Sequence, residues 1–115
     1  MHLKTLSTLA ALLVATPALA QAISGDADHV LWCASAYAQL ANDAAEQNDA
    51  GDTELYDTLA ATLTSEGIKL LRANAIPDER IAAIIQSYDD MVYVQLETPQ
   101  AKYPVESCEG LIRHG

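Results

Sequence analysis

The chain has 115 residues, half of them hydrophobic, and its 16 acidic against 6 basic residues give a formal net charge of −10. This length suits one domain, and the acidic balance argues against nucleic acid and anionic lipid as partners, because both require a basic protein surface. The charge is compatible with a cationic protein or peptide as partner, although acidity is also a common way to keep an exported protein soluble.

The first twenty residues have the pattern of a secretory signal peptide. Lys4 supplies a short basic start, residues 6–15 are almost entirely apolar, and residues 18–20 (ALA) place small side chains where a signal peptidase reads them. The apolar run is shorter than the roughly 18 residues that a membrane-spanning helix needs. We therefore predict cleavage before Gln21, no membrane span after cleavage, and a periplasmic or fully secreted mature chain of residues 21–115.

The mature chain begins with a long amphipathic helix that we expect from about Asp28 to Gln47. Residues 24–26 (SGD) offer N-cap chemistry ahead of it. The polar run at residues 47–51 (QNDAG) ends it as a turn. Its apolar side chains recur at steps of three and four residues: Val30, Cys33, Ala34, Tyr37, Leu40, Ala41 and Ala44.

The second predicted helix starts at a cap formed by Asp52 or Thr53 and stops near residues 74–75. Gly67 interrupts its apolar face, which indicates close helix packing or a kink, at a cost of about 1 kcal/mol relative to alanine. The apolar face of this helix consists of Leu55, Tyr56, Leu59, Leu63, Leu70 and Leu71.

The third predicted helix opens at Pro77, which suits a first helical position, and ends before Pro99. Residues 98–103 are expected to form a loop, and Pro104 opens a short helix that ends near Arg113. No strand-like alternation occurs in the sequence. The pattern predicts a single all-α domain, a small up-down bundle of three long helices whose open side is crossed by the short C-terminal helix. The stripe of the third helix is Ile81, Ile84, Ile85, Tyr88, Val92 and Leu96.

Cys33 and Cys108 are the only cysteines. In an exported chain they most simply pair, and a bond that closes a loop of this size contributes on the order of 4–5 kcal/mol in the chain-entropy model. A zinc site needs more Cys or His at paired spacing, and His29 and His114 look isolated. Redox dithiols usually have a C-x-x-C motif. We predict a structural disulfide that closes the bundle, with free thiols or an intermolecular bond as the alternatives.

Four side chains are candidate partner-binding residues. Trp32 and Tyr93 lie off the main apolar stripes, and an exposed Trp beside an exposed Tyr would form a binding patch. The alternative is that both cover the ends of the bundle or contact the C-terminal tail. Asp89 and Asp90 are adjacent in the third helix and point about 100° apart, so they form a solvated flank and do not converge on one reacting atom.

The sequence contains no phosphate-binding loop, dinucleotide fingerprint, nucleophile elbow or zinc-protease motif. The acidic residues lack calcium-loop spacing, and Asp26, Asp28 and His29 suit helix capping better than metal binding. We therefore predict no enzyme, no catalytic residue, no metal and no cofactor. The expected function is a protein-interaction module, such as an inhibitor, an immunity-like factor or an accessory subunit.

Two alternatives stay open beside this function. The first is a carrier of a small apolar ligand or a cation, which needs a cavity in the bundle. The second is a structural envelope component that assembles through an exposed apolar face. The small residues that would leave room for a carried ligand are Ala34, Ala38, Ala41 and Ala60.

Overall fold

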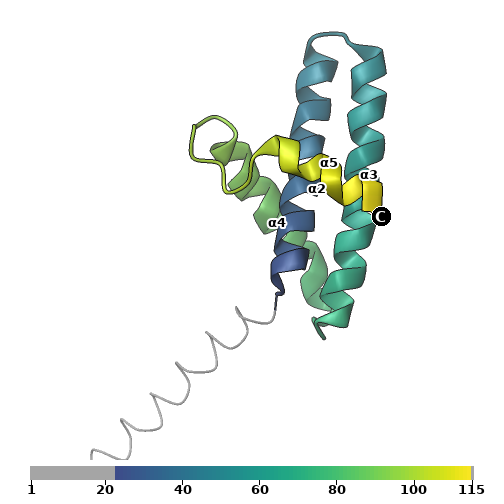
Figure 1. Cartoon of the computed structure of the whole chain (residues 1–115), viewed down its shortest axis with the longest axis vertical. Coiled ribbons are helices and arrows are strands. Elements are labelled where there is room, and N and C mark those ends of the chain that lie inside the picture. The colour runs from purple at the N-terminus through teal and green to yellow at the C-terminus, as the bar shows by residue number, and fades with distance from the viewer. Residues whose placement is uncertain (1–22, 115) are drawn as a thin grey trace, which may run out of the picture.

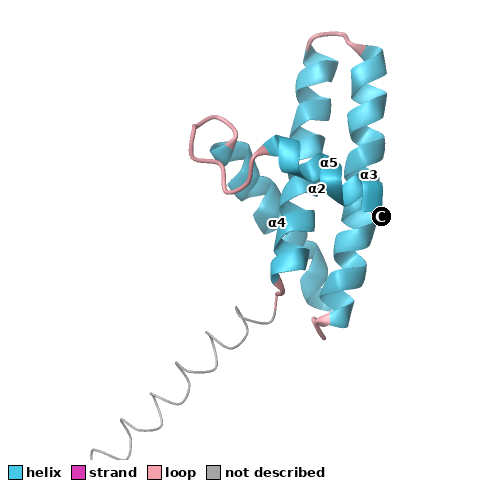
Figure 2. Cartoon of the chain, in the orientation of Figure 1, coloured by secondary structure: helices cyan, strands magenta, loops and turns pink. Residues whose placement is uncertain are grey.

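The chain is all-α, with three long helices and a short C-terminal one, as predicted (Figures 1 and 2). A computed structural model describes residues 23–114; the predicted signal peptide at residues 1–20 lies outside them. No helix within 23–114 is both long enough and apolar enough to cross a membrane. The elements in chain order are α2 (Gly25–Glu46), α3 (Ala50–Ala73), α4 (Asp78–Gln95), the 3-10 helix η1 (Val105–Ser107) and α5 (Cys108–His114).

Helix α2 begins three residues before the predicted start because Ser24 caps it. The Ser24 hydroxyl accepts a hydrogen bond from the backbone N–H of Ala27 (3.1 Å), and Asp26 and Asp28 lie in the first turn, where acidic side chains favour the helix dipole. The backbone N–H of Ser24 is in turn held by the side-chain oxygen of Asn74, 2.8 Å away. The start of α2 is thereby fixed to the end of α3.

The turn between α2 and α3 is shorter than predicted, and Asp52 and Thr53 do not cap α3. Asp49 does, by accepting a hydrogen bond from the backbone N–H of Asp52 (3.0 Å). Asn48 adopts a positive φ of 58°, which an asparagine tolerates better than most residues. The two helices consequently form a long antiparallel hairpin (Figure 1).

Helix α2 is the centre of the fold. It packs along the whole hairpin against α3, and α4 packs mainly against α2, while η1 and α5 cross it in front (Figure 1). Every residue from Val30 to Tyr37 is buried as a result, which is far more than the single apolar stripe that the sequence predicts. The end of the hairpin that carries the turn at 47–49 rises beyond α4 (Figure 1).

Gly67 marks a close approach between α3 and α2, the first of its two predicted roles. A Cβ atom at this position would lie 2.5 Å from Cδ2 and 3.0 Å from Cγ of Leu31. Leu31 is itself only 2% exposed, so it has little room to move away. The glycine therefore lets the two helices pack more closely than any other residue would allow.

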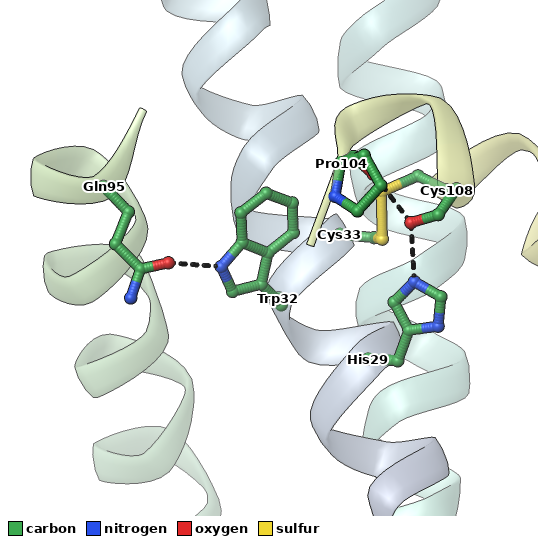
Figure 3. Close-up of a disulfide and its surroundings, with 7 residues drawn as sticks. His29, Trp32, Cys33, Gln95, Pro104 and Cys108 are labelled. Atoms are coloured by element: carbon green, nitrogen blue, oxygen red, sulfur yellow. Dashed lines mark hydrogen bonds between the residues drawn. A yellow bond between two sulfur atoms is a disulfide. The ribbon is translucent and has the colours of Figure 1, made fainter. Parts of the chain in front are cut away.

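The predicted disulfide between Cys33 and Cys108 is confirmed. The two Sγ atoms are 2.06 Å apart and the Cα atoms 5.6 Å apart. Since Cys33 lies midway along α2 and Cys108 opens α5, the bond holds the C-terminal segment across the hairpin (Figure 3).

Candidate functional site

The disulfide is surrounded by polar groups that the sequence does not bring together. His29 Nε2 lies 2.9 Å from the Ser107 hydroxyl, which also lies 2.7 Å from the carbonyl oxygen of Pro104 (Figure 3). A serine has a single O–H, and the carbonyl can only accept, so the hydroxyl donates to Pro104 and accepts from His29. The imidazole proton is thereby placed on Nε2.

The expectation that His29 is isolated is wrong. Ligand atoms of His29, Cys33 and Cys108 all lie within 4.8 Å of one another. His29 and Cys33 are four residues apart on α2 and so share one face of the helix. That H-x-x-x-C spacing was visible in the sequence, but the approach of Cys108 depends on how the C-terminal segment folds back.

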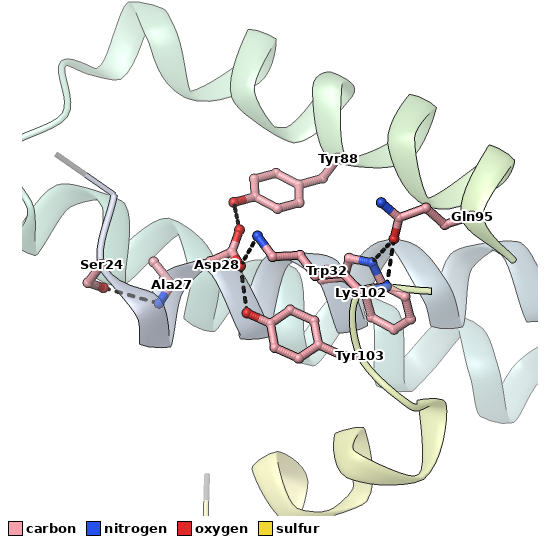
Figure 4. A network of polar contacts seen from close by, with 8 residues as sticks. All are labelled: Ser24, Ala27, Asp28, Trp32, Tyr88, Gln95, Lys102 and Tyr103. Carbon is pink, nitrogen blue, oxygen red and sulfur yellow. Dashed lines mark hydrogen bonds and ion pairs between the residues drawn. The ribbon is translucent and has the colours of Figure 1, made fainter. Parts of the chain in front are cut away.

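Asp28 is the junction of three distant segments (Figure 4). Its carboxylate accepts hydrogen bonds from the hydroxyls of Tyr88 on α4 (2.5 Å) and Tyr103 in the tail (2.6 Å), and Lys102 Nζ lies 2.7 Å away as an ion pair. The Tyr103 ring also stacks on His29, with ring centroids 4.3 Å apart. These contacts hold the tail on α2 independently of the disulfide.

The network shifts the pKa values of its members in opposite directions. Burial alone raises the pKa of Asp28, but the hydrogen bonds from Lys102, Tyr103 and Tyr88 and the charge of Lys102 outweigh it, so the pKa lies below its usual value. Burial and the hydrogen bond to Asp28 raise the pKa of Tyr103 to about 12. The same two causes raise the pKa of Tyr88 well above its ordinary value. At neutral pH the Asp28 carboxylate is therefore held by two neutral phenol groups.

Trp32 is not a surface residue, which corrects its place among the candidate partner-binding residues. It is 0% exposed and its indole N–H donates to the side-chain oxygen of Gln95, 2.9 Å away. Its ring packs edge-on against Tyr103, with centroids 5.6 Å apart. The alternative expectation for Trp32, contact with the C-terminal tail, is the one that the structure bears out. The physical reason is that α4 and the tail both cover the side of α2 on which Trp32 lies.

The other three candidates lie together on the exposed face of α4, which we call the α4 patch and define as Asp89, Asp90, Tyr93 and Val94. Tyr93 and Val94 are 53% and 60% exposed. Each follows an aspartate by four residues, so the patch consists of two parallel acidic–apolar pairs. Asp89 is also held by the Ser35 hydroxyl on α2, 2.5 Å away. Their role as partner-binding residues stays a prediction.

A second feature, which the sequence does not reveal, is an open groove of about 510 Å³ between the α2–α3 hairpin and the C-terminal segment. We call it the α5 groove. Its apolar part includes Leu55, which is 51% exposed, and the stacked rings of Tyr37 and Tyr56, 6.0 Å apart. The residues that line it are Tyr37, Leu40, Leu55, Tyr56, Leu59, Val105, Glu106, Glu109 and Ile112.

The α5 groove combines an apolar surface with negative charge. Glu106 and Glu109 are exposed and belong to its C-terminal wall, and every other lining residue is apolar or a tyrosine. Burial and the negative charge of Glu109 raise the pKa of Tyr37, so the charge of this wall acts on that tyrosine. Such a groove is suited to a ligand that carries both apolar and positively charged groups.

Comparison of the chain with models of protein families, with curated proteins and with solved structures returns no significant match.

Proposed function

We propose that this chain is an exported binding protein, and that its α5 groove takes a cationic amphipathic helix of a partner protein. The observation that carries the proposal is the groove itself, in which Leu55 is half exposed beside a wall that bears Glu106 and Glu109. A half-exposed leucine in a concave apolar surface is a feature of docking sites more than of solvated helix faces. An inhibitor, an immunity-like factor or an accessory subunit would act in this way.

The apolar surface and the acidic wall of the groove suit an amphipathic helix as the occupant. An amphipathic helix places apolar side chains at i, i+3, i+4 and i+7 in such a groove, and its flanking residues then lie over the rim. Lysine or arginine at the flanks would face Glu106 and Glu109. The net charge of −10 for the whole chain adds long-range attraction for a basic partner.

Export through a cleaved signal peptide is part of the same proposal. The Cys33–Cys108 disulfide supports an oxidising compartment, because such bonds persist mainly outside the cytosol. Native mass spectrometry of the protein from the envelope fraction, without reductant, tests this directly. A mature chain that begins at Gln21 and is two hydrogens lighter than the dithiol is expected. An uncleaved chain or two free thiols would contradict export.

The binding proposal is tested with a designed probe. The probe is a short helical peptide with leucines on one face and lysines on both flanks. We expect it to shift the backbone amide NMR signals of Tyr37, Leu40, Leu55 and Ile112 in the labelled protein. Leu55→Gln and Glu106→Gln should each weaken binding by about tenfold or less, as expected for single contacts worth about 1 kcal/mol.

Matched controls separate the α5 groove from the α4 patch. Val94→Gln removes a similarly exposed apolar side chain from α4, and Glu79→Gln removes a charge from its first turn. Neither should alter binding to the groove. Shifts confined to Asp90, Tyr93 and Val94 would move the binding site to the α4 patch. A peptide with glutamate in place of lysine that binds equally well would contradict the choice of a cationic partner.

NMR titration also tests the two alternative functions, a ligand carrier and a structural envelope component. A small apolar molecule such as a medium-chain fatty alcohol that shifts the core residues Ala34 and Ala60 would indicate a carrier with a ligand inside the bundle. Concentration-dependent signals on Tyr93 and Val94 without any peptide would indicate self-assembly and hence a structural component. Either result would contradict the proposal that the α5 groove binds a partner helix.

A further inference from the structure

The side chains around the disulfide form a ligand set. Cys33 and Cys108 supply two sulfur atoms, His29 supplies an imidazole nitrogen, and all three lie within 4.8 Å of one another. Within residues 23–114 this is the one group of three or more His, Cys, Asp or Glu side chains that converges so closely. We propose that, once the disulfide is reduced, these three side chains bind one thiophilic divalent ion, for which Zn²⁺ is the best chemical match.

The three ligands stay close together without the S–S bond. His29 and Cys33 are one helical turn apart on α2, so their spacing does not depend on the tail. Cys108 is held near them by the Tyr103 hydroxyl and the Lys102 ammonium group on Asp28, and by the stacking of Tyr103 on His29. Reduction therefore leaves two thiols and an imidazole facing one another.

Reduction of the disulfide and binding of the metal ion together conserve electrons, protons and charge. A dithiol reductant gives two electrons and two protons to the S–S bond, which becomes two thiols, while the reductant becomes a cyclic disulfide. The metal ion then displaces both thiol protons and binds two thiolates and a neutral imidazole. The divalent charge cancels that of the thiolates, so the complex is neutral overall and suits a place where both cysteines are 0% exposed.

The geometry needs only local adjustment. Zinc–sulfur bonds of about 2.3 Å place two sulfurs of a tetrahedral site roughly 3.8 Å apart, so the sulfurs separate by side-chain rotation. His29 exchanges its hydrogen bond with Ser107 for the ion, and the imidazole proton then moves to Nδ1. Two thiolates and one imidazole leave the fourth position for water. The ion would hold α5 on α2 in the place of the disulfide.

Cobalt serves as the probe because it is spectroscopically visible in zinc sites. The intact protein is reduced with dithiothreitol, freed of the reductant in the absence of oxygen, and titrated with Co²⁺ and then Zn²⁺. We expect one ion per chain, a thiolate-to-cobalt charge-transfer band in the near ultraviolet, and visible bands typical of tetrahedral cobalt. Zn²⁺ should abolish these bands and raise the melting temperature of the reduced chain.

His29→Gln is the decisive variant, since it retains a polar side chain and both cysteines. Its affinity for Zn²⁺ should fall by at least about tenfold, with helical circular dichroism unchanged. The disulfide-bonded protein should bind no Co²⁺ through sulfur. A reduced chain without the charge-transfer band, an unchanged affinity in His29→Gln, or one ion shared by two chains would each overturn the inference. None of these readouts depends on the α5 groove.

Discussion

Asp28 shows how one side chain joins segments that are distant in sequence. Its position in the first turn of α2 suits helix capping, which is how the sequence alone accounts for it. In the folded chain the same carboxylate holds Tyr88, Lys102 and Tyr103, from α4 and the tail. A carboxylate that is only partly exposed and is held by three donors is a stabilising junction as long as all of its partners remain.

Replacement of Asp28 by asparagine should destabilise the protein by about 1–3 kcal/mol, because two phenol hydroxyls and an ammonium group lose a charged acceptor. Urea unfolding followed by circular dichroism measures the loss. Asp26→Asn is the matched control: Asp26 lies in the same turn but is exposed, so its loss should be limited to a helix-dipole effect of about 0.3–1 kcal/mol. Equal effects of the two changes would show that the contacts of Asp28 add nothing to the free energy of unfolding.

The same network predicts how stability depends on pH. The pKa of Asp28 is lower in the folded chain, so its contribution is present above its unfolded pKa of roughly 4 and is lost as the pH falls through the folded value. The pKa of Tyr103 is raised to about 12, so its contribution is present below roughly pH 10 and is lost as the pH rises through 12. The free energy of unfolding, measured across this pH range, should depend less on pH in Asp28→Asn than in the unchanged protein, at both the acidic and the alkaline end.

Gly67 is the other residue whose role is set by a single contact. Alanine in a helix interior is ordinarily about 1 kcal/mol better than glycine. Here its Cβ would overlap the buried Leu31, so Gly67→Ala should instead destabilise by about 1–3 kcal/mol. Gly110→Ala in α5, where a Cβ meets no atom within 4 Å, should leave stability unchanged or raise it. Thermal unfolding of both variants measures the contrast, and a stabilised Gly67→Ala would show that Leu31 can move aside.

At the scale of elements, the short C-terminal segment matters more than its length suggests. Alone, η1 and α5 comprise only residues 105–114, too short to be stable as an isolated helix. They are held on the hairpin by the disulfide and by Tyr103, and they supply one whole wall of the α5 groove. The groove therefore exists only while this segment is docked.

Two anchors hold this segment, the disulfide and the contacts of Lys102 and Tyr103 with Asp28, so a variant that combines replacement of both cysteines by alanine with Asp28→Asn should separate groove formation from the rest of the fold. Loss of the disulfide should lower the free energy of unfolding by about 2–5 kcal/mol. Because α2, α3 and α4 pack together without it, most of the helical circular dichroism should remain under native conditions. Affinity for the lysine-flanked peptide should fall by more than about tenfold, as measured by calorimetry. Undiminished affinity would mean that the docked segment is not part of the site.

At the scale of the whole molecule, charge decides how a partner is approached. The net charge of −10 arises from 16 acidic residues and only 6 basic ones, and two of the acidic side chains line the α5 groove. Charges of this kind act over a distance set by the ionic strength, about 10 Å at 0.1 M salt. They therefore increase the association rate of a basic partner more than they lower its dissociation rate.

The association rate of the lysine-flanked peptide should accordingly fall as salt is added, while its dissociation rate changes little. Stopped-flow measurements at several salt concentrations test this. A peptide with glutamine in place of lysine provides the control and should show a nearly salt-independent rate. A salt effect carried entirely by the dissociation rate would contradict long-range attraction and would point to ion pairs that form only after docking.

The sequence by itself determined the class of the fold, because its information is local. Apolar residues at steps of three and four, breaks at residues 47–51 and 98–99, and the absence of alternation were sufficient to predict three long helices and a short one. The disulfide followed from there being only two cysteines in a chain predicted to be exported. An interior glycine costs stability unless something requires it, so Gly67 indicated either close helix packing or a kink, and its contact with Leu31 shows that it is close packing.

Only the tertiary structure decided which side chains meet. Trp32 is buried, because α4 and the tail cover a side of α2 that lies off its apolar stripe. The convergence of His29 on the disulfide and the partners of Asp28 depend on residues 102–108, which fold back over the hairpin. The α5 groove arises in the same way. Periodicity describes one helix at a time, whereas burial depends on how many neighbours a helix acquires, and α2 has neighbours on nearly every side over residues 30–37.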